Sequence, residues 1–139
     1  MIVVDSNVIS ELVRLEPDKN VLRWSHAANL TTLFTTAVCE AEILAGVALM
    51  PSGKRREALH EAMQAIFSRS FATRILPFDS HAAHHYAAVV ARRTALGRPI
   101  KDADAQIAAI CLCHGATIAT RDTGGFAHLE LNIFNPWTD

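Results

Sequence analysis

The first ten residues, MIVVDSNVIS, place an acidic residue at the junction between a short strand and a helix. Residues 2–4 form an apolar, β-branched run that is too short for a helix and is typical of a buried strand. Asp5 ends this run, Ser6 and Asn7 can cap a helix, and apolar residues then recur at helical spacing. Because ligands of open α/β sheets bind at the carboxyl ends of strands, Asp5 is a candidate site residue, with simple helix capping as the alternative.

The rest of the chain alternates short apolar segments with longer segments of helical periodicity. Further strands are predicted at residues 33–35, 74–76, 116–120 and 131–134, and helices at residues 17–28, 37–50, 54–72, 80–96 and 102–114. This alternation predicts an α/β fold, with a small twisted parallel sheet of four to five strands flanked by helices. Asp5 and Asp122 then follow the carboxyl ends of two parallel strands, at the same edge of the sheet.

Length and composition fit one globular domain spanning residues 1–139. Half of the residues are hydrophobic and 19% are charged, which excludes a disordered chain. No apolar run approaches the roughly 20 residues that span a bilayer, and the N-terminus lacks the basic region of a signal peptide. Three cysteines without a zinc or redox spacing indicate buried, reduced thiols, so we expect a cytoplasmic protein that does not contact a membrane.

Helical position separates the acidic residues of two helices into inward and outward groups. In the helix at residues 37–50, Glu42 is predicted to lie in the middle of the apolar stripe, with Glu40 on the opposite side. In the helix at residues 102–114, Asp104 shares the apolar face, whereas Asp102 is predicted to be the N-terminal cap. A carboxylate on an apolar face is costly unless it is paired or bound to a metal, so we expect Glu42 and Asp104 to be functional.

Four acidic residues can therefore converge from two strand ends and two helix faces: they are Asp5, Glu42, Asp104 and Asp122. Each one alone could be satisfied by a backbone N–H or an arginine. Together they form an oxygen-only donor set that suits Mg²⁺ or Mn²⁺ and not zinc. Such a cluster repels itself when empty, and with divalent metal it is typical of phosphodiester hydrolysis.

Six segments carry a resemblance to a known family. They are VVDSNVISE at residues 3–11, CEAEILAGV at 39–47, FD at 78–79, IKDADAQIAA at 100–109, ATIATRDTGGF at 116–126 and FNPW at 134–137. They occur in family order over nearly the whole chain. The sequence resembles the PIN-domain nucleases, in particular the VapC-type toxins of bacterial toxin–antitoxin pairs and, among these, the FitB-like group.

The resemblance implies a PIN-like fold and a metal-dependent endoribonuclease that hydrolyses RNA with a metal-activated water. By motif match, the family's site acids fall on the four residues Asp5, Glu42, Asp104 and Asp122. Ser6 matches a hydroxyl residue that supports the site, and we expect Thr120 to do the same. Asp102 is an additional acid at a position where relatives often carry a small residue.

The resemblance also implies partners. Toxins of this type pair with a small antitoxin whose C-terminal segment lies across the toxin and blocks the acidic site. They usually form homodimers, assemble further with the antitoxin, and contact promoter DNA only through it.

The charge balance agrees with an RNA substrate once the candidate site acids are set aside. The chain has a formal net charge of −1, with 13 basic and 14 acidic residues. Without the four site acids the balance becomes +3, which favours contacts with phosphate. Candidate RNA phosphate contacts are Arg93, Arg98, Lys101 and Arg121, with ordinary solvated charge as the alternative for each.

Two other functions remain open. A Mg-dependent phosphohydrolase would use Asp5 as a covalent nucleophile, although haloacid-dehalogenase-like enzymes require a second aspartate where Asn7 stands. A non-catalytic module that binds RNA or an antitoxin would keep the fold without cleavage. The complete set of four acids argues against this second alternative.

Overall fold

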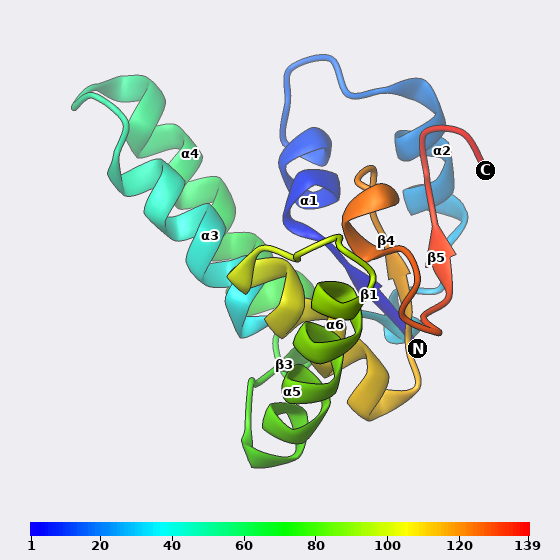
Figure 1. The fold of residues 1–139 in the computed structure, drawn as a ribbon. Helices are drawn as coiled ribbons and strands as arrows, with labels where there is room; N and C mark the ends of the chain where they lie inside the picture. The colour runs from blue at the N-terminus through cyan, green and yellow to red at the C-terminus, as the bar shows by residue number, and fades with distance from the viewer.

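A computed structural model describes all residues 1–139 as a five-stranded parallel sheet flanked by six α-helices (Figure 1). The strands are β1 (Ile2–Val4), β2 (Leu33–Thr36), β3 (Ile75–Leu76), β4 (Thr117–Ala119) and β5 (Ile133–Phe134). The helices are α1 (Ser6–Leu12), α2 (Lys19–Ala27), α3 (Ala37–Ala48), α4 (Lys54–Ala65), α5 (Ser80–Ala95) and α6 (Asp102–His114). The predicted α/β fold class is confirmed.

The sheet has the order β3-β2-β1-β4-β5, with every neighbouring pair parallel. The chain leaves β1 toward β2 and later returns to pair β4 on the other side of β1. This reversal of direction makes the carboxyl ends of β1 and β4 the place where an open α/β sheet binds its ligand.

Alternating side chains of β1 build two apolar cores on the two faces of the sheet. Val3 belongs to a core that includes Ile107 of α6, whereas Val4 belongs to a core that includes Val8 and Ile9 of α1. This is the alternation expected of a strand that is buried on both faces. Asp5, the next residue, is therefore held at a rigid position in the centre of the molecule.

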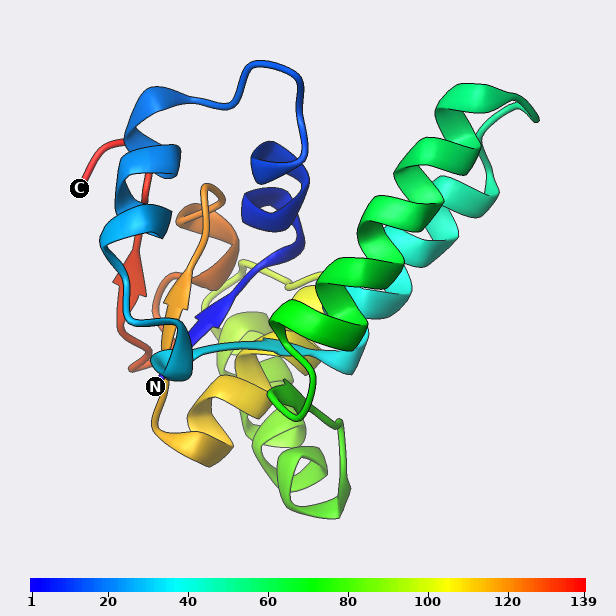
Figure 2. The same cartoon turned by 180° about the vertical axis from the view of Figure 1, so that it is seen from behind.

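Helices α3 and α4 pack side by side and project away from the sheet as a hairpin (Figure 2). The predicted helix at residues 54–72 is interrupted, because α4 ends at Ala65 and a π-helical turn (Ile66–Ser70) follows. None of the six helices is long and apolar enough to cross a membrane.

The second helix begins two residues later than predicted. Its N-terminal cap is Asp18, whose carboxylate accepts the backbone N–H groups of Asn20 and Val21 at 2.8 and 3.2 Å. Pro17 therefore precedes the cap instead of opening the helix. The capping carboxylate decides the start because it satisfies two N–H groups that have no partner within the helix.

Candidate active site

Asp5 lies at the end of β1, and all its side-chain contacts hold its carboxylate in one orientation. The residue is 5% exposed and caps α1, since its Oδ1 accepts the Ser6 backbone N–H at 2.7 Å. The Thr120 hydroxyl donates to Oδ2 at 2.8 Å, and the Cys39 thiol approaches Oδ1 at 3.7 Å. Helix capping and a site role, which the sequence presents as alternatives, are thus compatible in the same residue.

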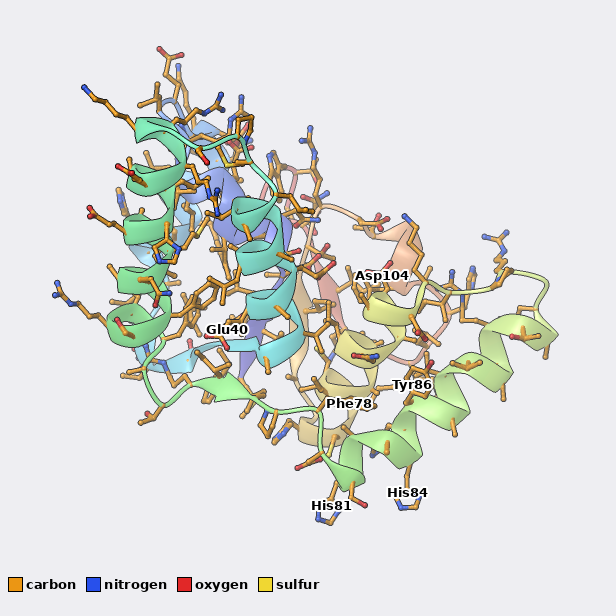
Figure 3. All side chains as sticks on the ribbon, turned by 90° about the vertical axis from the view of Figure 1, so that its left-hand side faces the viewer. Glu40, Phe78, His81, His84, Tyr86 and Asp104 are labelled. Atoms are coloured by element: carbon orange, nitrogen blue, oxygen red, sulfur yellow. The ribbon has the colours of Figure 1, made fainter.

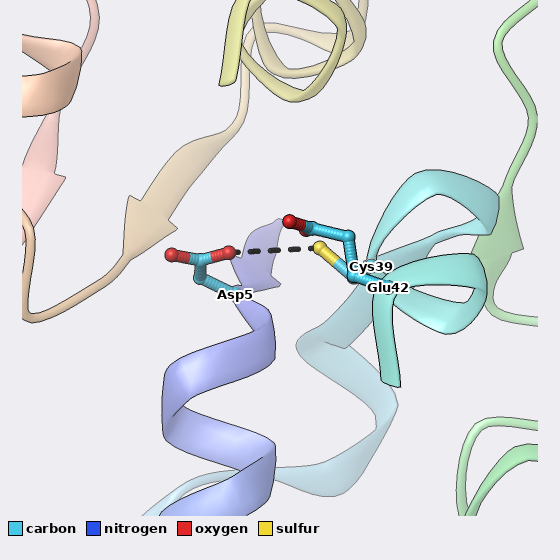
Figure 4. Close-up of side chains that lie close together, drawn as sticks. All are labelled: Asp5, Cys39 and Glu42. Carbon is cyan, nitrogen blue, oxygen red and sulfur yellow. Dashed lines mark hydrogen bonds between the residues drawn. The ribbon is translucent and has the colours of Figure 1, made fainter. Parts of the chain in front are cut away.

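Glu42 reaches this carboxylate from α3. The Ser6 hydroxyl lies 3.4 Å from Asp5 Oδ1 and 3.5 Å from Glu42 Oε1, so it bridges the two acids. The side chains of Asp5, Cys39 and Glu42 converge, with their potential ligand atoms within 4.8 Å of one another (Figure 4). The supporting role expected for Ser6 stays a prediction, and this position between the two acids is compatible with it.

The predicted burial of Glu42 is wrong. The buried stripe of α3 consists of Cys39, Ile43 and Val47, and Glu42 is exposed beside it. Glu40 is the half-buried one of the two glutamates, and it lies on the side of α3 away from Asp104 (Figure 3). The prediction fails because α3 is apolar nearly all round, so helical spacing alone does not identify its buried side.

Asp104 stands half-buried in the first turn of α6. Burial raises its pKa, and the neighbouring charges of Asp5 and Asp122 raise it further, while Lys101 and Arg93 act in the opposite direction. Asp104 therefore lies close enough to Asp5 and Asp122 to be affected by their charges. The shared face predicted for Asp104 is found, because the residues three, four and seven positions later are buried.

Asp102 is not the cap of α6. The capping position is occupied by Lys101, which makes no side-chain capping bond, and Asp102 is the first helical residue. Its carboxylate accepts the hydroxyl of Tyr86, whose ring packs edge-on against Phe78 (Figure 3). Asp102 is therefore bound to α5 on the exposed surface and is separate from the acid cluster.

Asp122 follows β4 in a tight loop. Its backbone N–H donates to the Thr120 hydroxyl oxygen at 3.0 Å, and its Oδ1 accepts the Gly125 N–H at 3.0 Å. A Cβ atom added at Gly125 would lie 2.5 Å from Asp122 Oδ2, so only glycine fits against this carboxylate. Thr120 thus links Asp5 and Asp122 through one hydroxyl group. The supporting role expected for it stays a prediction.

The four predicted acids form one electrostatic group. Although the Glu42 side chain is exposed, the protein around its carboxyl group removes part of its water, and this desolvation raises the pKa of Glu42. The charges of Asp5 and Asp104 raise it further. Carboxylates that raise one another's pKa repel each other, and a divalent cation relieves this repulsion. The donor set of the cluster therefore fits a metal ion.

Cys39 does not change the chemical character of this donor set. Its thiol is fully buried, and burial followed by the charge of Asp5 raises its pKa to about 12. The thiol is therefore protonated in the metal-free protein, and it donates a hydrogen bond to Asp5 Oδ1. The remaining donors are carboxylate oxygens, which suit Mg²⁺ or Mn²⁺.

Arg121 and Trp137 form one wall of a groove beside the acids. The groove has a volume of about 600 Å³ and continues to Ser6 and Glu42. The Arg121 guanidinium lies 5.1 Å from the centroid of the Trp137 ring. The sequence provides no sign of an aromatic residue near the site, because Trp137 lies in a segment without strand or helix periodicity.

Arg93 is placed differently from the other basic residues that the sequence suggests as phosphate contacts. Arg98, Lys101 and Arg121 are exposed, whereas Arg93 is only 6% exposed. Its guanidinium donates to the backbone carbonyls of Arg98 and Gly125, both at 2.7 Å. Two of its three guanidinium nitrogens are therefore used inside the protein, so Arg93 has fewer free donors for a phosphate than the three exposed residues.

The three histidines of α5 lie outside the site. His81 and His84 project into solvent from the outer face of this helix (Figure 3). Neither belongs to a group of potential metal ligands.

Comparisons with known proteins agree with the fold. Residues 2–131 match the family model described as PIN domain. The chain is 47% identical over 137 residues to plasmid stability protein StbB of Pseudomonas syringae pv. tomato, covering 99% of both chains. It is 44% identical over 137 residues to VapC ribonuclease Y4jK of Sinorhizobium fredii (99% of this chain, 98% of the relative), and 41% identical over 139 residues to Toxin FitB of Neisseria gonorrhoeae, covering 100% of both.

A solved structure, FitAB bound to the IR36 DNA fragment, superimposes with a TM-score of 0.93 at 42% identity, covering 99% of this chain and 96% of that chain. The crystal structure of FitAcB from Neisseria gonorrhoeae gives a TM-score of 0.94 at 40% identity and covers 100% of both. The parallel sheet, the convergent acids and these similarities lead to the same assignment: the chain belongs to the PIN-domain family.

Proposed function

We propose that this protein is an endoribonuclease that depends on Mg²⁺ or Mn²⁺ and hydrolyses phosphodiester bonds of RNA. The observation that carries the proposal is the acidic cluster at the carboxyl edge of the sheet. Ligand oxygens of Asp5 and Glu42 lie within 4.8 Å of each other, and Asp104 and Asp122 belong to the same set of mutually repelling charges. A divalent ion bound there supplies Lewis-acid stabilisation of the phosphate and lowers the pKa of the attacking water. The name of the relative Y4jK, a VapC ribonuclease, supports the same reaction.

One group of residues would bind the metal ion, and another group would bind the RNA substrate. Asp5 is the most constrained donor, because Ser6 and Thr120 fix both its oxygens. Glu42 and Asp104 complete the donor set from the two helices beside it, together with Asp122 from the β4 loop. Exposed Arg98, Lys101 and Arg121 are available for flanking phosphates.

We further propose that the protein is the toxin of a bacterial toxin–antitoxin pair. Support comes from the relative named Toxin FitB and from the structural similarity to the FitAB complex on DNA. A small antitoxin would cover the acidic site, and contact with promoter DNA would occur only through that partner. A homodimer that assembles further with the antitoxin is part of this proposal.

The test is cleavage of a mixed RNA pool by the purified, antitoxin-free chain in Mg²⁺, in Mn²⁺ and in EDTA. Asp5→Asn and Asp104→Asn are expected to abolish cleavage while the fold survives. Asp102→Asn is the matched control, since this acid is two residues away on the same helix but is bound to Tyr86. It is expected to keep wild-type activity.

Cleavage that persists in EDTA or in Asp104→Asn would contradict the proposed metal-dependent site. RNA binding without cleavage in either metal would instead support the non-catalytic module. A trapped phosphate on Asp5 would support the phosphohydrolase.

A further inference from the structure

Arg93, in the last turn of α5, is a buried cation without an acidic partner. It is 6% exposed, and the only ion pair of the structure is formed elsewhere. Because a buried guanidinium is costly unless its N–H groups are satisfied, its hydrogen bonds are informative. Nε donates to the Arg98 carbonyl at 2.7 Å, and Nη1 donates to the carbonyls of Gly125 and Ala127 at 2.7 and 3.4 Å.

One of these carbonyls belongs to the segment that leads to Asp104. Arg98 is in the loop between α5 and α6, and its own N–H returns a bond to the Arg93 carbonyl at 2.9 Å. The loop ends at Lys101, whose carbonyl accepts the first-turn N–H of Ala105 at 2.9 Å. Arg93 therefore fixes the entry to the helical turn that carries Asp104.

The other contact reaches Asp122. Gly125 belongs to a short 3₁₀ turn (Gly124–Phe126), and its carbonyl accepts from Arg93 while its N–H donates to Asp122 Oδ1. The space between this glycine and the carboxylate is too small for a side chain, since an added Cβ would be 2.5 Å from Oδ2. A displacement of the turn would therefore displace the Asp122 carboxylate.

We infer that Arg93 is a positioning residue of the metal site. It fixes Asp104 and Asp122 relative to each other by donating hydrogen bonds to the Arg98 carbonyl, in the loop before α6, and to the Gly125 carbonyl, in the turn that contacts Asp122. The inference rests on the proposed function, because it concerns the same four acids. It explains why a full positive charge is buried where no carboxylate pairs with it. The fixed charge also reduces the repulsion that Asp104 experiences from its neighbours.

The experiment is a calorimetric titration of Mn²⁺ into the folded, metal-free chain and its variants. Arg93→Met is expected to weaken Mn²⁺ binding by roughly 10- to 100-fold, the usual loss when an outer partner of a metal ligand is removed. Arg92→Met is the matched control. Arg92 precedes Arg93, is exposed, and donates to the His128 carbonyl at 2.7 Å, beyond the turn that touches Asp122. This variant is expected to bind Mn²⁺ like the wild type.

A double-mutant cycle separates positioning from a general loss of stability. If Arg93 acts through Asp122, the combination of Arg93→Met with Asp122→Asn loses less affinity than the product of the two single losses. Arg93→Lys keeps the charge but lacks the planar fork of donors, so its Mn²⁺ affinity is expected to be intermediate. If Arg93→Met does not fold, Arg93→Lys takes its place in the double-mutant cycle.

Wild-type affinity in Arg93→Met or Arg93→Lys, or fully multiplicative losses in the cycle, would overturn the inference and leave the proposed nuclease intact. Failure of the wild-type chain to bind Mn²⁺ would instead overturn the proposed metal site, and the inference with it.

Discussion

The hydroxyl of Thr120 donates a hydrogen bond to Asp5 Oδ2 at 2.8 Å, joining residues 115 positions apart in the chain. The same oxygen accepts the Asp122 backbone N–H at 3.0 Å. One buried hydroxyl thus sets the distance between two acids that follow neighbouring strands, β1 and β4. It also satisfies an oxygen of a carboxylate that is almost completely buried.

Replacing Thr120 with valine keeps the shape of the side chain but removes this link. We expect Thr120→Val to lower the free energy of unfolding by about 1–3 kcal/mol, because a buried carboxylate oxygen and an N–H group lose their partner. Mn²⁺ affinity should fall as well, since Asp5 and Asp122 are no longer fixed relative to each other. Denaturant unfolding and Mn²⁺ titration measure both effects. Thr120→Ser, which retains the hydroxyl, should preserve Mn²⁺ affinity, and equal losses in both variants would contradict this role.

Gly125 tests how closely the Asp122 carboxylate is packed. We expect Gly125→Ala to displace this carboxylate and reduce both Mn²⁺ affinity and RNA cleavage, because the new methyl group would lie 2.5 Å from Oδ2. Gly124→Ala is the control, since a Cβ atom there has no heavy atom within 4 Å. The comparison requires Mn²⁺ titrations and cleavage rates of the two variants. Equal behaviour of the two alanine variants would show that the packing at Gly125 does not matter.

The repulsion among the acids predicts how stability depends on pH. In the folded chain the pKa values of Glu42 and Asp104 are raised above the ordinary 4.5 and 3.8, first by burial and then by neighbouring carboxylates. The folded state therefore binds protons more tightly than the unfolded state, and these two groups destabilise the metal-free protein at neutral pH. Their destabilising effect is relieved as the pH falls through the raised, folded-state pKa values.

In EDTA, the contribution of these groups should raise Tm as the pH is lowered from neutrality through their raised pKa values. Protons compete with metal for the same oxygens, so the increase in Tm caused by Mn²⁺ should be larger at high pH. Thermal melts of the wild type and of a Glu42→Gln, Asp104→Asn double variant give the comparison. An unchanged pH dependence in the double variant would assign the effect to other groups.

The strands and the location of the site could be predicted because their signals are local. The run at residues 2–4 and the acid that follows it lie next to each other in the sequence, and the parallel sheet places the end of β4 beside them. Thr36 illustrates the same point: it is the last residue of β2 and caps α3 by accepting the Cys39 N–H at 3.0 Å.

The side of α3 that faces the core could not be predicted, because it depends on how the α3–α4 hairpin packs against the sheet. The role that we propose for Arg93 could not be predicted from the sequence for a different reason. Its partners are backbone carbonyls, including one 32 positions away. Because every residue has a backbone carbonyl, the sequence does not indicate which one accepts a hydrogen bond. Trp137 meets Arg121 only because the segment after β5 folds back over the β4 loop, where no periodic pattern indicates a contact.

The groove wall formed by Arg121 and Trp137 should contribute to RNA binding and not to the chemical step. Trp137 holds the Arg121 guanidinium beside the acids by a cation–π contact, and exposed contacts of this kind contribute about 0.5–1 kcal/mol. Trp137→Leu should therefore raise KM for an RNA oligonucleotide roughly two- to fivefold with kcat nearly unchanged, as expected when ground-state and transition-state binding are lost equally. Arg121→Gln should raise KM further, because it also removes a phosphate-binding charge. Lys54→Gln, at the exposed start of α4, is the control and should leave KM unchanged. If steady-state kinetics of Arg121→Gln show a lower kcat and a constant KM, Arg121 acts in the chemical step instead.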